Sequence, residues 1–293
     1  MVLFYAMGGG MGHLMRIKVL SENLNIHNFK ILTSNDLAFQ LFDERKILFV
    51  EPDLSKIFNV YKKHLKNLIR KSNIKQIYLD AFPNGLLGEL DWIFEEKDLK
   101  LTYIARRLIW KNYKPFLKAT NFHFHKVIKL EPLENDHEAF INASSGNITT
   151  MLLKYPDPDA DKTGDQINHI DSPIWLIVHA FHKEELEQII EYAVETARLE
   201  NKEPYWVIIS NIPVDTPEPG ILIDSTHAFH WFPVADKIFS ACGFNTAYQL
   251  KGFRDKHISI PFPRKFDDQF WRKKYLENQN AANREKLVFP PIS

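Results

Sequence analysis

Short runs of apolar residues alternate along the chain with longer stretches in which apolar positions recur at helical spacing. In the first half the runs are Val2–Ala6, Phe29–Thr33, Ile47–Val50, Gln76–Leu79, Leu101–Ile104 and Val127–Leu130. In the second half they are Ile174–Val178, Tyr205–Ile209, Ile221–Ile223, Lys237–Phe239 and Ile258–Ile260. Because several runs are continuously apolar, we expect strands that are buried on both faces, as in a parallel sheet.

Helical periodicity fills the intervals between these runs. After the first run the apolar positions are Leu14, Ile17, Leu20 and Leu24, and a second clear helix is predicted over 184–199. Strands that alternate with helices are typical of βαβ units. The pattern therefore predicts an α/β fold of two successive domains, with a ligand cleft at the carboxyl ends of their strands.

A change of character between residues 142 and 172 suggests where the two domains meet. Residues 143–147 and 155–161 are rich in Ser, Gly, Asn, Asp and Pro, which favour turns and linkers. We therefore predict an N-terminal domain over 1–160 and a C-terminal domain over 161–293 that ends in a polar tail.

Composition narrows the class of protein. The 293 residues include 37 basic and 37 acidic side chains, so the zero net charge gives no reason to expect a nucleic-acid partner. Cys242 is the only cysteine, which excludes an intrachain disulfide and a thiolate metal cluster. Without a signal-peptide pattern or a bilayer-spanning run, we expect a cytoplasmic protein. The basic stretch 61–71 is a solvated helix face or a peripheral contact with anionic lipid.

A glycine-rich segment follows the first predicted strand and opens the first predicted helix. It contains Gly8, Gly9, Gly10 and Gly12 and ends at His13. Glycines let another group approach the backbone, and a helix start favours phosphate or a developing oxyanion. His13 could act as a base toward a sugar hydroxyl, or it could be structural. The segment matches neither the G-x-G-x-x-G dinucleotide fingerprint nor a P-loop.

A second cluster lies in the C-terminal half. Gly243 follows a predicted strand, with Asn245 and Thr246 placed to cap the next helix and Gln249 about one turn further on. Such a helix start could hold a diphosphate. A Pro-bracketed loop then leads to Asp267, Asp268 and Gln269, which either contact a ligand or cap another helix.

At these two clusters the chain resembles the GT-B glycosyltransferases related to the bacterial lipid II-forming N-acetylglucosaminyltransferase. The residues that carry the resemblance are the glycine-rich segment with His13, Ala235-Asp236, Gly243, Thr246, Pro261 and 267–269. The motif that begins at Asp80 and runs to Gly85, with Gly88-Glu89-Leu90, also resembles a group of predicted glycosyltransferases of this fold.

The resemblance implies two Rossmann-like domains whose parallel sheets face a central cleft. It implies that the C-terminal domain holds a nucleotide-sugar donor, UDP-linked in the first instance, and that the N-terminal domain holds the acceptor near the glycines and Asp80. It implies His13 as the catalytic base and residues 267–269 near the donor sugar. Transfer would need neither a metal nor another cofactor, and the acceptor would be a glycan, a lipid-linked molecule or a small molecule.

Two features depart from the family. Gln249 stands where a glutamate often grips the ribose hydroxyls, so the charge-assisted contact is lost. The loop after the first C-terminal strand contains His179 and His182 instead of small residues, and His182 could replace backbone contacts to phosphate. Glycosyl transfer is therefore our first hypothesis, and a nucleotide-sugar epimerase of the same fold or a non-catalytic nucleotide-sugar binder are the alternatives.

Overall fold

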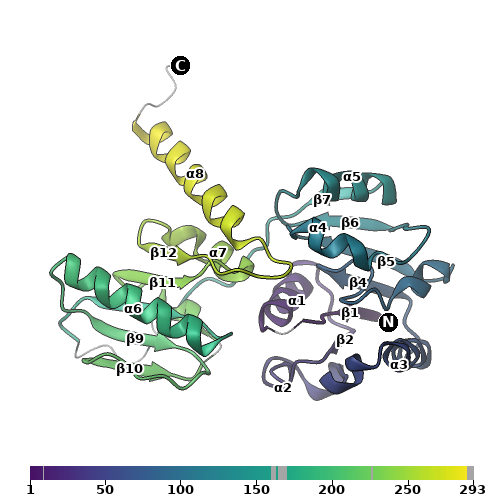
Figure 1. The fold of residues 1–293 in the computed structure, drawn as a ribbon, viewed down its shortest axis with the longest axis horizontal. Coiled ribbons are helices and arrows are strands. Elements are labelled where there is room, and N and C mark those ends of the chain that lie inside the picture. Colours follow the sequence, from purple (N-terminus) through teal and green to yellow (C-terminus); the bar gives the residue numbers. More distant parts are fainter. Residues whose placement is uncertain (9, 160–162, 164–169, 226, 289–293) are drawn as a thin grey trace. The chain divides into compact units, whose positions relative to one another are not determined.

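The structure is a computed structural model, and it describes residues 1–8, 10–159, 163, 170–225 and 227–288. The chain divides into two compact units (Figure 1). Unit 1 is Met1–Lys154 together with Lys265–Asp267, and unit 2 is Tyr155–Arg264 together with the chain from Asp268 onward. The domain division predicted between residues 160 and 161 lies outside the described residues and stays a prediction.

Unit 1 contains a seven-stranded parallel sheet in the order β3-β2-β1-β4-β5-β6-β7. Its strands are β1 (Val2–Tyr5), β2 (Phe29–Thr33), β3 (Ile47–Phe49), β4 (Gln76–Asp80), β5 (Lys100–Ala105), β6 (Lys126–Lys129) and β7 (Ile148–Thr150). Its α-helices are α1 (Gly12–Asn23), α2 (Ala38–Leu41), α3 (Phe58–Lys71), α4 (Trp110–Tyr113) and α5 (Asn135–Ser144), with short 3-10 turns η1 to η4 between them.

The alternation of side chains along β1 explains how this sheet is covered on both faces. Leu3 and Tyr5 belong to the same buried cluster as Leu65 and Ile69 of α3. The strand's other face carries Phe4, which packs edge to face against Phe29. Both faces are buried, as the continuous apolar run predicted.

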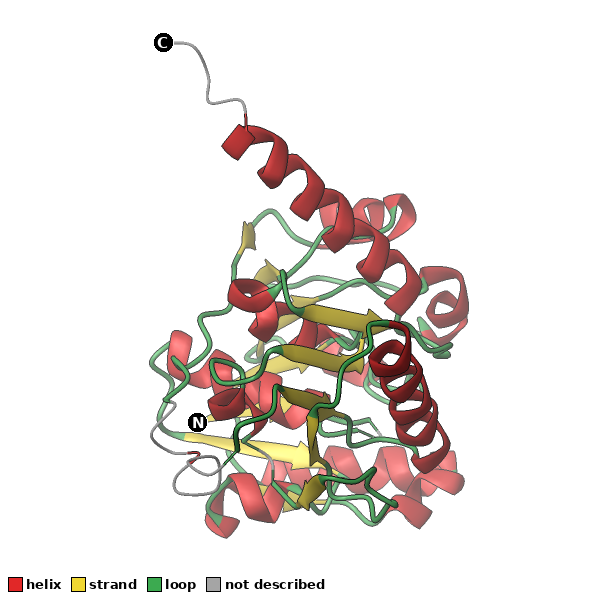
Figure 2. Ribbon diagram, turned by 90° about the vertical axis from the view of Figure 1, so that its left-hand side faces the viewer, coloured by secondary structure: helices red, strands yellow, loops and turns green. Residues whose placement is uncertain are grey.

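Unit 2 contains a five-stranded parallel sheet in the order β10-β9-β8-β11-β12. Its strands are β8 (Ile174–Val178), β9 (Tyr205–Ile209), β10 (Gly220–Ile223), β11 (Lys237–Ala241) and β12 (His257–Ile260). Its α-helices are α6 (Lys183–Leu199), α7 (Phe244–Gln249) and α8 (Gln269–Val288), with the 3-10 turns η6 and η7. Figure 2 shows the strands in yellow and the helices that flank them in red.

The predicted α/β fold class, with two parallel sheets and flanking helices, is confirmed. One strand was not predicted, because residues 142–172 were interpreted as linker. Within that stretch Ile148 pairs with Val127 and adds β7 to the edge of the first sheet. With three residues and two exposed side chains, β7 is too short and too polar to give a strand pattern.

Helix α3 accounts for the basic stretch at 61–71. Its buried positions are Tyr61, Leu65 and Ile69, whereas its lysines are exposed (63 and 71) or half-buried (62 and 66). Among the described helices, none combines the length and the apolar character that crossing a bilayer requires.

Candidate active site

The strand order of unit 1 brings the two N-terminal motifs to one place. The central strands β1 and β4 are neighbours, and the chain leaves β1 toward β2 and leaves β4 toward β5 on the other side. Such a point in a parallel sheet opens a crevice at the carboxyl ends of the strands. The glycine-rich segment follows β1, and Asp80 is the last residue of β4. The predicted candidates Gly10, Gly12, His13 and Asp80 therefore lie at one edge of the sheet, while Gly9 lies outside the described residues.

A charged cluster fills this point. Nδ1 of His13 lies 2.6 Å from Oδ2 of Asp80. Arg16, one helical turn after His13, donates from Nε to Oδ1 of Asp80 at 2.6 Å and from Nη2 to Oδ2 at 2.7 Å. All three side chains are buried, and Asp80 has no exposed surface. The cluster is thus a buried carboxylate that is contacted by two side chains of α1, one helical turn apart.

The chemistry of the cluster fixes the state of His13. Burial lowers the pKa of His13 below its usual value, and the carboxylate of Asp80 only partly opposes this effect. Burial alone would raise the pKa of Asp80, but the charge of Arg16 and the hydrogen bonds from His13 and Arg16 outweigh it and hold that pKa well below its usual range. Because a carboxylate can only accept, the neutral imidazole carries its proton on Nδ1 and presents Nε2 as an acceptor.

Gly8 and Phe82 are neighbours of the His13 imidazole. No residue in the described part of the chain bonds Nε2 of His13. A Cβ atom on Gly8 would lie 2.6 Å from Cδ2 and Nε2 of His13, and Gly8 has a φ of 155°. The ring of Phe82 stacks on the imidazole with centroids 5.6 Å apart. Gly8 is therefore needed for room beside His13, and Phe82 fixes the plane of the ring.

A second buried carboxylate holds the loop that follows Asp80. Glu89 accepts hydrogen bonds from the hydroxyl of Tyr5 and, at 2.7 Å, from the backbone N–H of Leu87. The Tyr5 oxygen in turn accepts from the N–H of Leu86 at 2.9 Å. Burial, and next the charge of Glu89, raise the pKa of Tyr5, so its hydroxyl remains a donor. Within the motif that supported the resemblance, Gly85 and Glu89 thus have a structural role.

Asp267 belongs to unit 1, although we predicted it beside the donor residues of the C-terminal half. Its Oδ1 accepts from Nη1 of Arg106 at 2.5 Å, and Arg106 is buried at the end of β5. The segment 265–267 joins unit 1 through an isolated bridge between Leu108 and Asp267. Asp267 is thus grouped with unit 1, and the next residues, Asp268 and Gln269, with unit 2. The place of all three near a donor sugar stays a prediction.

Unit 2 repeats the same strand arrangement, with β8 and β11 as the neighbouring central strands. Gly243 is the N-cap of α7, and the described structure places no atom within 4 Å of a Cβ built on it. Helix α7 has no side-chain cap and no acidic residue in its first turn. Thr246 and Gln249 lie on this helix and are partly buried, and no described residue bonds the Gln249 amide.

Buried polar side chains support this turn from behind. Arg272 of α8 has no exposed surface, and its Nη1 donates to the carbonyl of Cys242 at 3.0 Å. Oε1 of Gln269 accepts from the N–H of Phe262 at 3.0 Å. Asp268 caps α8 by accepting from the N–H of Trp271 at 3.1 Å. Of the predicted residues, Asp268 and Gln269 thus have structural partners, and Asn245 contacts the hydroxyl of Tyr155 at 3.3 Å.

The loop after β8 carries a second ionic network. His179 lies 3.2 Å from Glu185 of α6, and Glu185 also pairs with Arg264 through both carboxylate oxygens. Burial lowers the pKa of His179 to about 4, more than Glu185 raises it. His182 is the exposed N-cap residue of α6. The network therefore involves His179, which was not among our site residues, and His182 joins it only through its backbone N–H, which lies 3.5 Å from Nε2 of His179.

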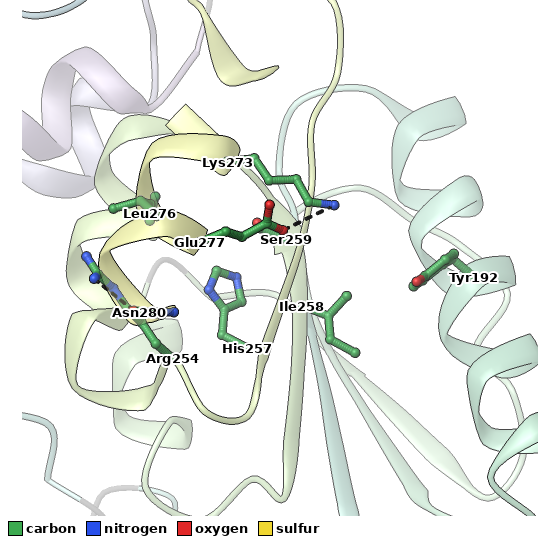
Figure 3. A pocket seen from close by; sticks show the side chains of 10 residues that line it. Tyr192, Arg254, His257, Ile258, Ser259, Lys273, Leu276, Glu277 and Asn280 are labelled. Atoms are coloured by element: carbon green, nitrogen blue, oxygen red, sulfur yellow. Dashed lines mark hydrogen bonds and ion pairs between the residues drawn. The ribbon is translucent and has the colours of Figure 1, made fainter. Parts of the chain in front are cut away.

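A pocket of about 300 Å³ lies at the open edge of the second sheet (Figure 3). Arg254 and His257 precede and begin β12, and Lys273, Glu277 and Asn280 project from α8. On this wall Arg254 donates from Nη1 to Asn280 at 3.1 Å and Lys273 lies 3.9 Å from Glu277, whereas Nε of Arg254 is buried without a hydrogen-bond partner among the described residues. None of the predicted site residues lines it.

Sequence reasoning missed Arg16 and Arg272, two of the three buried arginines described above. Each looks like a surface residue of an amphipathic helix, and the only available signal for Arg16 is its i+3 spacing from His13. Among the described residues, no group of three or more His, Cys, Asp or Glu side chains could hold a metal ion.

No protein-family model matches the sequence, and no curated protein matches it. Solved structures do resemble the chain. The spinosyn forosaminyltransferase SpnP superposes with a TM-score of 0.63 at 11% identity, over 94% of this chain and 83% of SpnP. Sucrose-phosphate synthase from Thermosynechococcus elongatus superposes with a TM-score of 0.57 at 10% identity, over 99% of this chain and 90% of the synthase. A protein described as a UDP-N-acetylglucosamine 2-epimerase from Listeria monocytogenes superposes with a TM-score of 0.51 at 11% identity, over 86% of this chain and 75% of the other.

These similarities identify the class of fold. The chain has the GT-B fold, with two parallel α/β units, and the fold that the sequence resemblance implied is confirmed. The same fold carries transferase and epimerase names among these neighbours, so the choice between activities depends on the site residues.

Proposed function

We propose that this chain is a glycosyltransferase that moves a sugar from a nucleotide diphosphate donor, a UDP-sugar first of all, to a hydroxyl group of an acceptor. The observation that carries the proposal is the buried pair of His13 and Asp80 at the carboxyl ends of β1 and β4. It provides a neutral imidazole, oriented through Nδ1, whose Nε2 can accept a proton.

In the proposed reaction the acceptor hydroxyl donates its hydrogen bond to Nε2 of His13. As the hydroxyl oxygen forms its bond to the anomeric carbon, Nε2 takes the proton and the bond from that carbon to the diphosphate oxygen breaks. The electron pair leaves with the nucleoside diphosphate. Asp80 stabilises the imidazolium that forms, and Arg16 keeps Asp80 ionised throughout.

We further propose that unit 2 binds the donor at the turn between β11 and α7. The space around Gly243 and the uncapped start of α7 suit a diphosphate, with Asn245 and Thr246 nearby. Arg272, directly behind the turn, adds a positive charge. Gln249 would then bond the ribose hydroxyls, and the leaving group would need no metal ion.

The test is turnover of a panel of nucleotide sugars, with and without hydroxyl acceptors that include glycans, lipid-linked molecules and small phenols. We expect one donor to be consumed only with an acceptor, in buffer with EDTA, with a mass gain of one sugar on the acceptor. The variant His13→Gln should lower turnover by about 10²- to 10⁴-fold while donor binding is retained. The matched control is His27→Gln, since His27 is exposed in the same unit.

The other outcomes identify the alternatives. Conversion of the donor into an isomer without any acceptor would make the protein an epimerase, the activity named for one structural neighbour. Donor binding without turnover in the presence of any acceptor would indicate a nucleotide-sugar binding protein and would overturn the proposal. A strict metal requirement would overturn only its metal-independent form. A cytoplasmic location and a peripheral membrane contact through α3 belong to the same proposal, and fractionation of cells would test both.

A further inference from the structure

The residue after Asp80 has a strained backbone. Ala81 has a φ of 65°, in the left-handed region that alanine rarely occupies, and it is fully buried. The N–H of Phe82 donates to the carbonyl of Asp80 at 2.8 Å, so Ala81 is the central residue of a γ-turn. A γ-turn with positive φ is rare and persists only where its surroundings hold it.

This turn joins the two residues that contact His13. Asp80 precedes Ala81 and accepts from Nδ1 of the imidazole, whereas Phe82 follows Ala81 and stacks on the ring. In an extended strand, residues i and i+2 project from the same face, but the γ-turn changes the direction of the chain between them. The conformation of Ala81 therefore sets how the carboxylate and the aromatic ring meet one imidazole.

Two hydrogen bonds from β5 hold Ala81. Its N–H donates to the carbonyl of Ile104 at 3.0 Å, and its carbonyl accepts from the hydroxyl of Tyr103 at 3.0 Å. The side chain of Tyr103 is fully buried on the strand that pairs with β4. Only the second of these bonds comes from a side chain, so it alone depends on the identity of a residue.

His137 of α5 fixes the hydroxyl of Tyr103. Nε2 of His137 lies 2.9 Å from the Tyr103 oxygen. Because the single Tyr103 proton goes to the carbonyl of Ala81, Nε2 of His137 must be the donor in this contact. Trp110 stacks on the imidazole of His137, with centroids 4.0 Å apart and planes within 9°. Burial, and next the charge of Arg107, lower the pKa of His137 to about 3, so this donor stays neutral.

We propose that Tyr103, backed by His137, is a positioning residue that holds the γ-turn at Ala81 and thereby sets Asp80 and Phe82 against His13. Neither Tyr103 nor His137 touches His13. Their part in transfer rests on the proposed function, whereas their effect on the imidazole does not.

The test is the tautomer of His13, read from the ¹⁵N shifts of histidine-labelled protein and assigned with His13→Gln. In the unaltered chain we expect the Nδ1–H form, because Asp80 accepts that proton. In Tyr103→Phe the turn relaxes and Asp80 no longer fixes the proton, so a substantial Nε2–H fraction should appear. Asp80, Arg16 and Arg106 are the charged groups that influence the pKa of His13, and the substitution alters none of them.

Ala81→Gly provides the rescue. Glycine occupies a positive φ without strain, so the double variant Ala81→Gly/Tyr103→Phe should return His13 to the Nδ1–H form. If the transferase is active, kcat should fall by about 10- to 100-fold in Tyr103→Phe and recover in the double variant. The matched control is Tyr113→Phe. Tyr113 is also buried and bonds the same loop, donating to the carbonyl of Gly85 at 2.7 Å, but its hydroxyl makes no hydrogen bond to Ala81.

Each outcome decides the proposal. A tautomer shift in Tyr103→Phe that Ala81→Gly reverses, together with an unshifted Tyr113→Phe, supports it even if no donor is ever turned over. An unchanged His13 in Tyr103→Phe overturns it, and so does an equal shift in Tyr113→Phe, which would indicate general loosening. Should Tyr103→Phe fail to fold, His137→Phe should give a smaller shift in the same direction, and an unchanged His13 there would also overturn it.

Discussion

The two units use the same strand arrangement in opposite ways. In unit 1 the carboxyl ends of β1 and β4 are occupied by the buried cluster of His13, Arg16 and Asp80. In unit 2 the corresponding strands are β8 and β11, and the turn that follows β11 has open space around Gly243. The His179–Glu185 pair lies after β8. The same topology can therefore hold a reacting group in a fixed position, as in unit 1. In our proposal it also leaves space for a ligand, as in unit 2.

The two glycines Gly8 and Gly243 express this difference. A side chain on Gly8 would collide with His13, so the protein itself requires this glycine. Gly243 has a φ of −67°, which any residue adopts, and a side chain there would meet no described atom within 4 Å. The chain's own packing therefore explains the first glycine but not the second.

The largest expected effect comes from breaking the cluster of unit 1. Asp80→Asn leaves the buried Arg16 guanidinium without its carboxylate, and we expect the free energy of unfolding to fall by about 3–5 kcal/mol. Urea denaturation would measure it. Asp268→Asn is the control from unit 2, because asparagine caps a helix about as well as aspartate. Equal stabilities of the two variants would contradict our account of the cluster.

A slightly smaller effect is expected from Gly8→Ala. The added Cβ must displace an imidazole that Asp80 and Phe82 hold, so kcat/KM should fall by about 100-fold, or about 2.7 kcal/mol in the activation barrier. Steady-state kinetics with the donor identified above would show it. Gly146→Ala, at an open position of the same unit, should leave kcat/KM unchanged. An active Gly8→Ala would mean that the Nε2 edge of His13 is not used.

Acid should destabilise the chain through histidines that are buried in the neutral form. The folded-state pKa of His137 is about 3, whereas the unfolded value is about 6.5. Below pH 6.5 only the unfolded state takes up this proton, so stability falls as pH falls, and the loss stops near pH 3. At pH 5 the protonation of His137 in the unfolded state should lower the free energy of unfolding by about 2 kcal/mol.

Urea denaturation of the unaltered chain and of His137→Phe, at pH 7 and pH 5, measures this contribution. Between pH 7 and pH 5 the free energy of unfolding of the variant should fall by about 2 kcal/mol less than that of the unaltered chain. The remaining acid sensitivity should include His179 and His257 of unit 2, because burial lowers the pKa of each to about 4. An equal loss in both proteins would show that His137 is not neutral in the folded state.

The smallest effect is expected at Gly243. Gly243→Ala should change the free energy of unfolding by less than about 1 kcal/mol, since alanine restricts the unfolded chain but is a poorer N-cap residue than glycine. If the donor diphosphate occupies the open space, donor affinity should nevertheless fall by about tenfold, or about 1.4 kcal/mol. Calorimetric titration would measure this. Gly252→Ala, also at an open position of unit 2, is the control. Unaltered affinity in Gly243→Ala would move the donor site away from this turn.

The fold could largely be predicted from the sequence, because continuously apolar runs such as Ile174–Val178 mark buried parallel strands. The edge strand β7 was not predicted, since its side chains are mostly exposed and apolar periodicity depends on burial. His13 was a candidate because it ends the glycine-rich segment after a strand, and Asp80 because its motif resembles that of predicted glycosyltransferases. Their pairing was not predicted, since it depends on β1 and β4 being neighbours, and strands between them in the sequence lie elsewhere in the sheet.

Residues whose role depends on contacts distant in the sequence were the ones that sequence reasoning missed. Arg16 and Arg272 are charged helix residues, for which exposure is the ordinary expectation. Tyr103 and His137 lie on different elements, and neither belongs to a recognisable motif. The conformation of Ala81 leaves no sequence signal either, because an alanine at positive φ is held by its partners and not by its own preference.

The buried Cys242 makes the turn before α7 observable in solution. It is the only thiol in the chain, it has no exposed surface, and its own carbonyl accepts from Arg272. A thiol reagent can therefore modify the native protein at one position, and only when that turn opens. The rate of modification would report the opening of a single backbone segment in an untagged, unmutated protein, with and without each nucleotide sugar.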